Sequence, residues 1–162
     1  MADLQLAQSA GALLKPAMRI AGLGQTFTAA DIGEIPGLWA RLAPNLPLAG
    51  QGGGETFGVS RVAPDGSGMH YLAGAALSPG RPIPDGFEGI DLSARPYLVF
   101  RQTLDGGALH PQMKAAAREI WGKRVPACGL TLAQAPELEV YPPDFQPDRA
   151  GAWVEWWLPV EG

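Results

Sequence analysis

The segment TFGVSRVAPDGSGMHYLAGAAL, residues 56–77, decides the fold because it predicts a β-hairpin. Its two arms, 56–62 and 69–77, are rich in apolar residues. Between them stands Pro-Asp-Gly-Ser-Gly at 64–68, and these residue types favour tight turns. Two strand-like runs joined by such a turn are typical of neighbouring antiparallel strands. The middle of the chain therefore predicts an antiparallel sheet.

Upstream of the hairpin, the sequence predicts one strand and one helix. The strand covers residues 18–27, and the helix begins near Pro36, because proline is favoured in a first helical turn. The apolar residues of this helix recur at helical spacing: Ile35, Leu38, Trp39 and Leu42. Strand, helix, strand, strand is one βαββ unit.

The second half of the chain repeats this order without an obvious repeat of the residues. A linking strand is expected at 87–92, and a strand at 96–103 precedes the best helix, at about 108–123. The apolar stripe of that helix consists of Leu109, Met113, Ala117, Ile120 and Trp121. Strands at 137–141 and 152–160 complete a second βαββ unit.

Two such units predict an α+β fold. We expect two βαββ repeats to form a curved antiparallel sheet with both helices on one face and a ligand crevice on the other. Residues 17–162 would form a single domain after an N-terminal lead of residues 1–16. The repeats would cover about 17–78 and about 94–160.

Composition and charge exclude several classes of function. The 162 residues carry 12 Lys and Arg against 16 Asp and Glu, a net charge of −4, with no basic cluster to neutralise phosphates. Direct nucleic-acid binding is therefore not expected. The single cysteine, Cys128, and the two histidines give no metal-binding pattern, and no cofactor motif is present. Without a visible signal peptide or membrane-spanning segment, the sequence predicts a cytoplasmic protein that does not bind membranes.

Several motifs stand in an order that is typical of one known family. They are Ile35-Pro-Gly-Leu-Trp-Ala-Arg-Leu42, Thr56-Phe-Gly-Val-Ser60, Met69-His-Tyr-Leu-Ala-Gly74, Pro136-Glu-Leu-Glu-Val-Tyr141 with Pro143-Asp-Phe145, and Val154-Glu-Trp-Trp-Leu-Pro-Val160. In these motifs the chain resembles the GyrI-like effector-binding domain. This SHS2-repeat domain also forms the ligand-binding half of Rob-type AraC regulators and MerR-type multidrug regulators.

The resemblance covers about residues 17–160 and departs from the family at Ser93-Ala-Arg-Pro-Tyr97. Only the tyrosine of the family's Pro-Ala-Gly-x-Tyr pattern is retained there. No helix-turn-helix segment precedes residue 17. The resemblance therefore implies a stand-alone effector-binding domain without a DNA-binding domain.

Glu139 is the first candidate for a functional residue. Side chains alternate along a strand, so Glu139 and Tyr141 share one face while Leu138 and Val140 share the other. We expect the apolar pair to face the helices and Glu139 with Tyr141 to face the crevice. A carboxylate among aromatic rings attracts a lipophilic cation by Coulomb and cation–π forces. The resemblance implies the same role, since relatives bind bulky cationic or aromatic compounds with a buried glutamate at this strand position.

Other candidates for the ligand site are aromatic or acidic. The resemblance favours Trp39 and Tyr71, whereas Glu155 is equally compatible with a pocket and with the surface. Further aromatic candidates are residues that more often belong to a core: Trp157, Tyr97, Phe100 and Trp121. His110 is expected at the surface.

Three functions remain open from the sequence. The favoured one is a small-molecule-binding protein that senses or sequesters lipophilic cationic or aromatic compounds, multidrug binding in the broad sense. The second is a hydrolase of reactive cyclopropane-type or other electrophilic compounds, in which Glu139 would be catalytic and Tyr141 a hydrogen-bond donor. The third is a protein-interaction modulator like the family's gyrase inhibitor. A homodimer is compatible with each.

Overall fold

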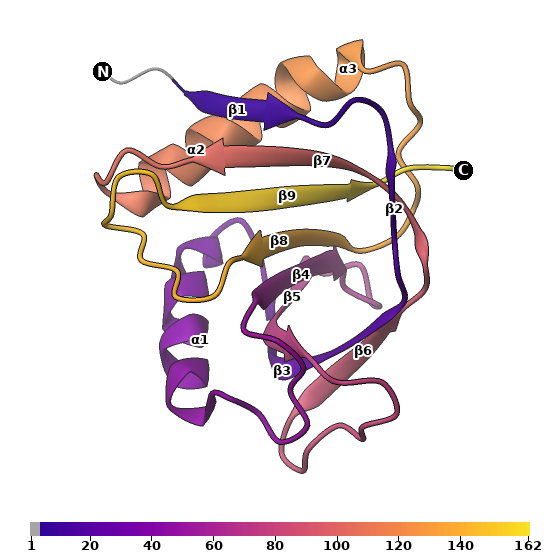
Figure 1. Cartoon of the computed structure of the whole chain (residues 1–162), viewed down its shortest axis with the longest axis vertical. Helices are drawn as coiled ribbons and strands as arrows, with labels where there is room; N and C mark the ends of the chain where they lie inside the picture. Colours follow the sequence, from indigo (N-terminus) through magenta and orange to yellow (C-terminus); the bar gives the residue numbers. More distant parts are fainter. Residues whose placement is uncertain (1–3) are drawn as a thin grey trace.

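The computed structural model describes residues 4–162, and within them nine strands form one antiparallel sheet (Figure 1). Its order is β1-β7-β9-β8-β4-β5-β3-β6, and β2 also pairs with β7. The strands are β1 Gln5–Gln8, β2 Leu13–Lys15, β3 Met18–Phe27, β4 Thr56–Val62, β5 Met69–Ala76, β6 Glu88–Leu92, β7 Arg95–Thr103, β8 Glu137–Tyr141 and β9 Trp153–Pro159. The helices are α1 Ile35–Leu42, α2 Leu109–Glu119 and the short α3 Val125–Ala127, with a π-helical segment at Ile120–Arg124 between the last two.

The sheet is built from two equivalent units, which confirms the predicted α+β class. The first is β3-α1-β4-β5 and the second β7-α2-β8-β9. In each unit the strands lie in the same relative order, and the units meet where β8 pairs with β4. In that central pairing Glu139 stands opposite Gly58. The predicted linking strand is β6, which pairs with β3 at the edge of the sheet.

The hairpin of β4 and β5 forms as its turn residues predict. Gly66 has a φ of 73°, a conformation that glycine adopts without a steric penalty. The Asp65 side chain accepts hydrogen bonds from the backbone N–H and the hydroxyl of Ser67, at 2.9 and 2.6 Å. The pairing places Val59 opposite Leu72 and so fixes which side chains share a face.

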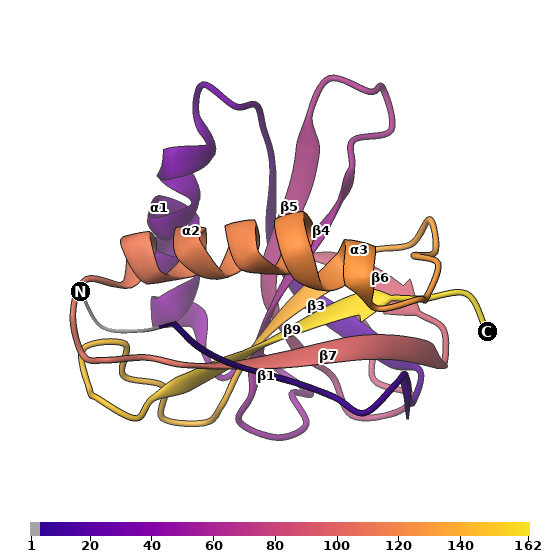
Figure 2. The same cartoon turned by 90° about the horizontal axis from the view of Figure 1, so that it is seen from above.

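Both long helices cover the same face of the sheet (Figure 2). From α1, Leu38 and Leu42 are buried against Phe27, Tyr71 and Ala73. At the end of α2, Ile120 packs with Leu98, Phe100 and Leu158 of β7 and β9. The apolar stripe predicted for α1 is therefore directed at the sheet. Of the stripe predicted for α2, Ile120 packs on the sheet, whereas Trp121 is exposed.

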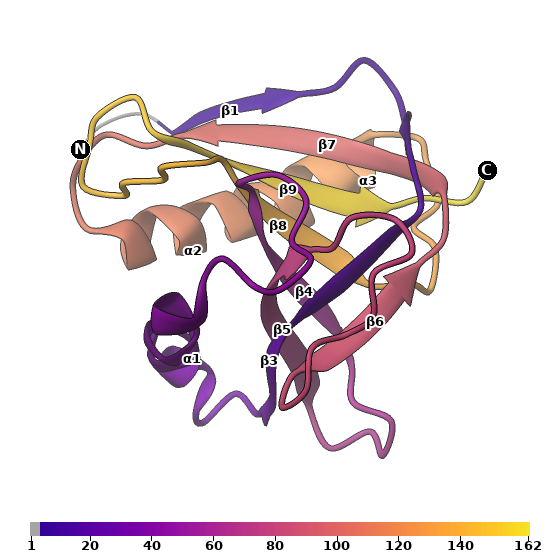
Figure 3. The same cartoon turned by 60° about the horizontal axis from the view of Figure 1, so that its bottom comes forward.

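The opposite face is filled by the largest apolar cluster of the protein. The sheet curls strongly between β7 and β6 (Figure 3). Side chains from both halves meet inside the curl. The buried members of this cluster are Ile20, Phe57, Val59, Leu72, Leu92, Tyr97, Val99, Leu138, Val140 and Trp157. The predicted orientation of Leu138 and Val140 toward the helices is therefore wrong. The alternation of side chains along β8 correctly predicted which residues share a face. It could not show which of the two faces the helices cover.

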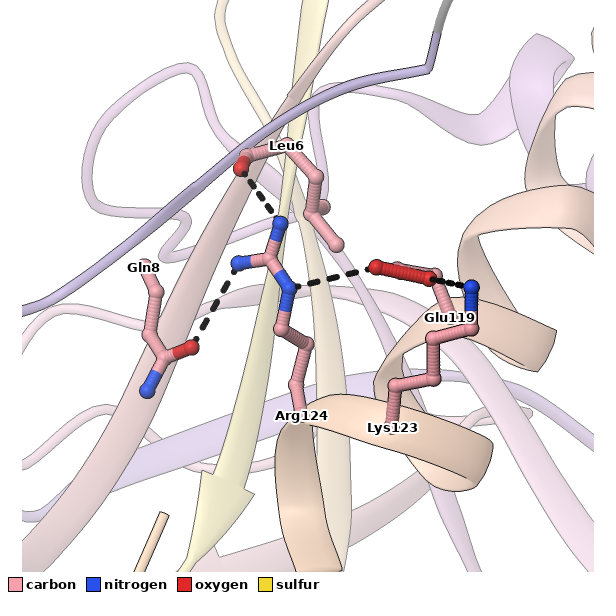
Figure 4. A network of polar contacts seen from close by, with 5 residues as sticks. All are labelled: Leu6, Gln8, Glu119, Lys123 and Arg124. Atoms are coloured by element: carbon pink, nitrogen blue, oxygen red, sulfur yellow. Dashed lines mark hydrogen bonds and ion pairs between the residues drawn. The ribbon is translucent and has the colours of Figure 1, made fainter. Parts of the chain in front are cut away.

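The segment expected as a lead contributes two strands to the sheet, β1 and β2, which both pair with β7. Arg124 links β1 to the helical segment after α2 (Figure 4). Its guanidinium donates to the carbonyl oxygen of Leu6 at 3.3 Å and to Glu119 Oε1 at 3.4 Å. Among the helices of residues 4–162, none has both the length and the apolar character needed to cross a bilayer.

Candidate functional site

A cavity of about 780 Å³ opens between α1 and α2, above the centre of the sheet. This volume lies in the range of pockets that hold drug-sized molecules. Its walls are mostly apolar and aromatic. The lining residues are Ile32, Ile35, Pro36, Trp39, Thr56, Tyr71, Leu109, His110, Met113, Lys114, Ala117, Glu139, Tyr141, Phe145 and Trp156.

The pocket lies on the helix-bearing face of the sheet, whereas the sequence predicted the opposite face. The reason is the curl, because the inner side of the curled sheet is packed with side chains such as Val140 and Trp157. On the other side, α1 covers one unit and α2 the other. The strands at the junction of the units, β8 and β4, supply Glu139, Tyr141 and Thr56 to the pocket.

Glu139 forms the polar centre of the pocket. Both tyrosine hydroxyls donate to the same carboxylate oxygen, Oε1, from Tyr71 at 2.8 Å and from Tyr141 at 3.0 Å. The indole Nε1 of Trp39 donates to the Tyr71 hydroxyl at 3.0 Å, which extends the chain of hydrogen bonds to α1. The second oxygen, Oε2, accepts no hydrogen bond from residues 4–162 and is not enclosed. The carboxylate is thus oriented on one side and open on the other.

Gly58 makes room for this arrangement. It lies opposite Glu139 on β4, and a Cβ there would overlap the Tyr71 hydroxyl and approach Glu139 Oε1 to 2.8 Å. The Gly in the motif Thr56-Phe-Gly-Val-Ser60 is therefore explained by the close approach of Tyr71 to Glu139.

Burial decides the protonation of these groups. It raises the pKa of the Glu139 carboxyl, and the hydrogen bonds from Tyr71 and Tyr141 offset this effect only in part. Burial and the nearby carboxylate raise the pKa of both tyrosine hydroxyls well above the usual range, so they remain donors. Burial, with the charge of Glu139, also raises the pKa of Glu137 to about 7. The site therefore holds a carboxylate that gains from a positively charged neighbour.

Aromatic rings line the pocket together with Glu139. Trp39 and Tyr141 meet edge to face with their centroids 5.4 Å apart, and Tyr141 lies 4.9 Å from Phe145. Trp39 and Tyr71 are 6.4 Å apart in a similar edge-to-face contact. Such rings offer apolar area and π faces to a ligand without demanding one shape.

Trp156 forms another wall and is tied to α2. It stands opposite Glu139 in the pairing of β8 and β9, so the two side chains share a face. Its indole Nε1 donates to Gln102 Oε1 at 3.1 Å, and the amide of the buried Gln102 donates to the carbonyl oxygen of Gln112 at 2.8 Å. This relay fixes the position of the first turns of α2 relative to the sheet.

Of the predicted site residues, Glu139, Tyr141, Trp39 and Tyr71 meet in the pocket, while the others lie elsewhere. Tyr97 and Trp157 are buried on the inner side of the curl. Glu155 shares that face and pairs with Arg101 at 2.8 Å.

Phe100 and Trp121 also lie away from the pocket lining, for different reasons. Phe100 is on the helix face but is fully enclosed beneath the end of α2. Trp121, in the π-helical segment, is 39% exposed. An aromatic side chain alone does not reveal which face or which depth it occupies.

Sequence reasoning missed one wall of the pocket on the helix α2. His110 is exposed, as expected, and yet it lines the pocket mouth together with Lys114. Met113 and Ala117, expected only in the apolar stripe, line the pocket as well. These residues are spaced by three or four positions, so they lie along one face of the helix. That spacing was the available signal for a wall of α2.

The fold and the pocket together define a class: an α+β small-molecule-binding domain made of two βαββ units, with its cavity between the two helices. The sequence model of the GyrI-like small molecule binding domain matches residues 13–161. The protein therefore belongs to the GyrI-like family.

The relatives that it resembles include regulators. The transcriptional regulator BrlR of Pseudomonas aeruginosa is 28% identical over 149 residues, which cover 90% of this chain and 53% of the regulator. The chain thus spans about half the length of this curated relative.

Several solved structures share the fold, and three of them match over nearly the whole chain. A protein from Staphylococcus aureus MU50, described as a transcription regulation protein, has a TM-score of 0.73 and 21% identity, with 99% of both chains covered. SAV2435 bound to tetraphenylphosphonium has a TM-score of 0.72 and 20% identity, covering 99% of this chain and 95% of that one. An integron cassette protein of Vibrio cholerae has a TM-score of 0.66 and 19% identity, covering 98% and 97%.

Proposed function

We propose that the protein binds lipophilic cationic or aromatic molecules in the pocket between α1 and α2, with Glu139 as the counter-charge. The observation that carries this proposal is the asymmetry of the carboxylate. Oε1 is held by Tyr71 and Tyr141, while Oε2 opens on the cavity without a donor from residues 4–162. A cation in the cavity would supply the missing interaction.

The surroundings favour a large cation with apolar groups over a small hydrated one. A charge in a partly dry site interacts with its partner more strongly than in water. Each aromatic face can add about 0.5–2 kcal/mol of cation–π attraction. The walls provided by Trp39, Tyr141 and Phe145 would at the same time bury the apolar groups of the ligand.

The binding of tetraphenylphosphonium by SAV2435 supports this class of ligand. We further propose that binding serves the sensing or sequestration of such compounds. The match to about half of a transcriptional regulator supports a sensing role. In such a role, another domain or another protein would respond when the pocket is occupied.

Tetraphenylphosphonium is the direct probe of the proposal. Titration calorimetry should detect binding to the wild type and a loss of about tenfold or more in affinity for Glu139→Gln, since the substitution removes the charge and keeps the shape. Glu155→Gln is the matched control, because Glu155 lies on the neighbouring strand and outside the pocket. Equal affinities of the wild type and Glu139→Gln would refute the role of Glu139, and no binding to any variant would refute the ligand class.

The same carboxyl supports hydrolysis as a second candidate. A glutamate with a raised pKa can accept a proton from water near neutral pH, and Tyr71 and Tyr141 could donate to a developing negative charge. Incubation with an electrophilic cyclopropane compound should then give turnover that Glu139→Gln abolishes. Tight binding without turnover would leave binding as the function.

A further inference from the structure

The charges that line the pocket are arranged by depth. Glu139 lies at the floor on β8, while His110 and Lys114 lie on α2 and are exposed at the mouth. The two rim residues are four positions apart and therefore lie one helical turn from each other on the same face of α2. The pocket thus has an acidic floor and a basic rim.

Lys114 is not neutralised by a neighbouring acid. None of the ion pairs within residues 4–162 includes it. Of the basic residues farther along the same helical run, Lys123 and Arg124 are paired, since Lys123 Nζ lies 3.6 Å and Arg124 Nε 3.4 Å from the carboxylate of Glu119 (Figure 4). The ammonium of Lys114 is therefore available to a molecule that enters the pocket.

This basic rim is unfavourable for a ligand that carries positive charge alone. Such a ligand gains from Glu139 at the floor but is repelled by Lys114 at the mouth. A ligand with a cationic apolar end and an anionic end would gain from both. Residues 110 and 117 are seven positions apart, so α2 lines the pocket over about 10 Å of its axis.

We propose that the pocket prefers lipophilic zwitterions, with the cationic end at Glu139 and a carboxylate or similar anionic group at Lys114. His110 would add a hydrogen-bond donor to the same anionic group. This inference rests on the proposed function and adds a selectivity residue, Lys114, and a narrower ligand class to it.

Two probes that differ only at one end test the preference: (4-carboxybutyl)triphenylphosphonium and its primary amide. At pH 7.5 both carry the same phosphonium, but only the first also carries a negative charge. Calorimetry at low ionic strength should show that the wild type binds the carboxylate about threefold to fivefold more tightly, the size expected for an exposed ion pair. This preference should shrink in 0.5 M salt, because salt screens exposed charges.

Substitutions then assign the preference to one residue. Lys114→Gln should abolish it and leave the affinity for the amide unchanged or higher. Lys123→Gln, on the same helical run but outside the pocket, should keep it. Glu139→Gln should lower the affinity for both probes.

The outcomes distinguish a failure of the zwitterion preference from a failure of the proposed function. If neither probe binds to the wild type, the proposed function fails and the preference fails with it. If both probes bind equally well to the wild type, the zwitterion selectivity is refuted while cation binding stands. If Lys114→Gln retains the preference, Lys114 is refuted as the residue that causes it.

Discussion

Trp156 and Trp157 are neighbours in the chain, and they lie on opposite faces of the same sheet. Trp157 is 8% exposed and packs edge to face against Phe57 inside the curl. Trp156 is half-buried, lines the pocket and keeps its indole N–H bonded to Gln102. Both faces are aromatic, but one is filled by the protein and the other leaves a cavity.

The same division occurs on β8, where Leu138 faces the filled side and Glu139 the pocket. The difference arises from what covers each face. The curl brings apolar side chains from distant strands together on one side, which closes it. On the other side two separate helices cover the two units, and the junction between them remains open. The site is thus a consequence of joining two similar units.

The largest expected effect comes from the filled side. Trp157→Ala should lower the free energy of unfolding by about 3–5 kcal/mol, because it leaves a cavity among Phe57 and Tyr97. Trp156→Ala should cost less than half of that and should reduce tetraphenylphosphonium affinity, since it removes a pocket wall. Urea denaturation with calorimetry checks both. Similar losses of stability in the two variants would contradict the contrast between the faces.

A smaller effect is expected from Gly58→Ala. The added methyl group would displace Tyr71 from Glu139, so we expect a loss of stability of about 1–3 kcal/mol and weaker binding of tetraphenylphosphonium. Gly37→Ala is the control, because a Cβ there meets nothing within 4 Å and alanine favours the helix α1. Unchanged binding by Gly58→Ala would show that the Tyr71–Glu139 contact does not shape the site.

The smallest effect concerns Glu137, on the same face as Glu139. Its pKa is raised to about 7 in the folded protein, so the folded state favours the protonated form. Its contribution to stability is complete below the unfolded pKa near 4.5 and is lost as pH rises through 7. We compare the free energy of unfolding of Glu137→Gln with that of the wild type. Allowing for solvent access, this difference should shift by about 1 kcal/mol in favour of the variant between pH 5 and pH 8. Thermal unfolding at both pH values measures this, and a constant difference would count against a buried, titrating Glu137.

The sequence predicted the elements of the fold well because each has a local cause. Turn residues at 64–68 specify the hairpin, and the spacing of Leu38 and Leu42 specifies α1. The contribution of β1 and β2 was not predicted, since their weakly patterned residues form strands by pairing with β7. Pairing between distant segments leaves little trace in local patterns.

The site was predicted in its centre and missed at its edges. Strand alternation placed Glu139 and Tyr141 on one face, and the family resemblance added Trp39 and Tyr71, which meet them in the pocket. The face that the helices cover could not be deduced, because it depends on the curl of the whole sheet. For the same reason Trp157 was expected in the pocket and Trp156 was not. The ligand-binding role of these residues stays a prediction.

The central claim is that Glu139 is the counter-charge of a bound cation. A bound cation should lower the raised pKa of Glu139, so binding should release a proton when the pH is near that pKa. The direct test is calorimetry of tetraphenylphosphonium binding from pH 5 to 9, in two buffers of different ionisation enthalpy. We predict that the wild type and Glu137→Gln bind more weakly as pH falls through the titration of Glu139 and release a proton there. Glu139→Gln should bind weakly at every pH without proton release. A wild-type affinity that does not change with pH, with no proton released on binding, would contradict the account.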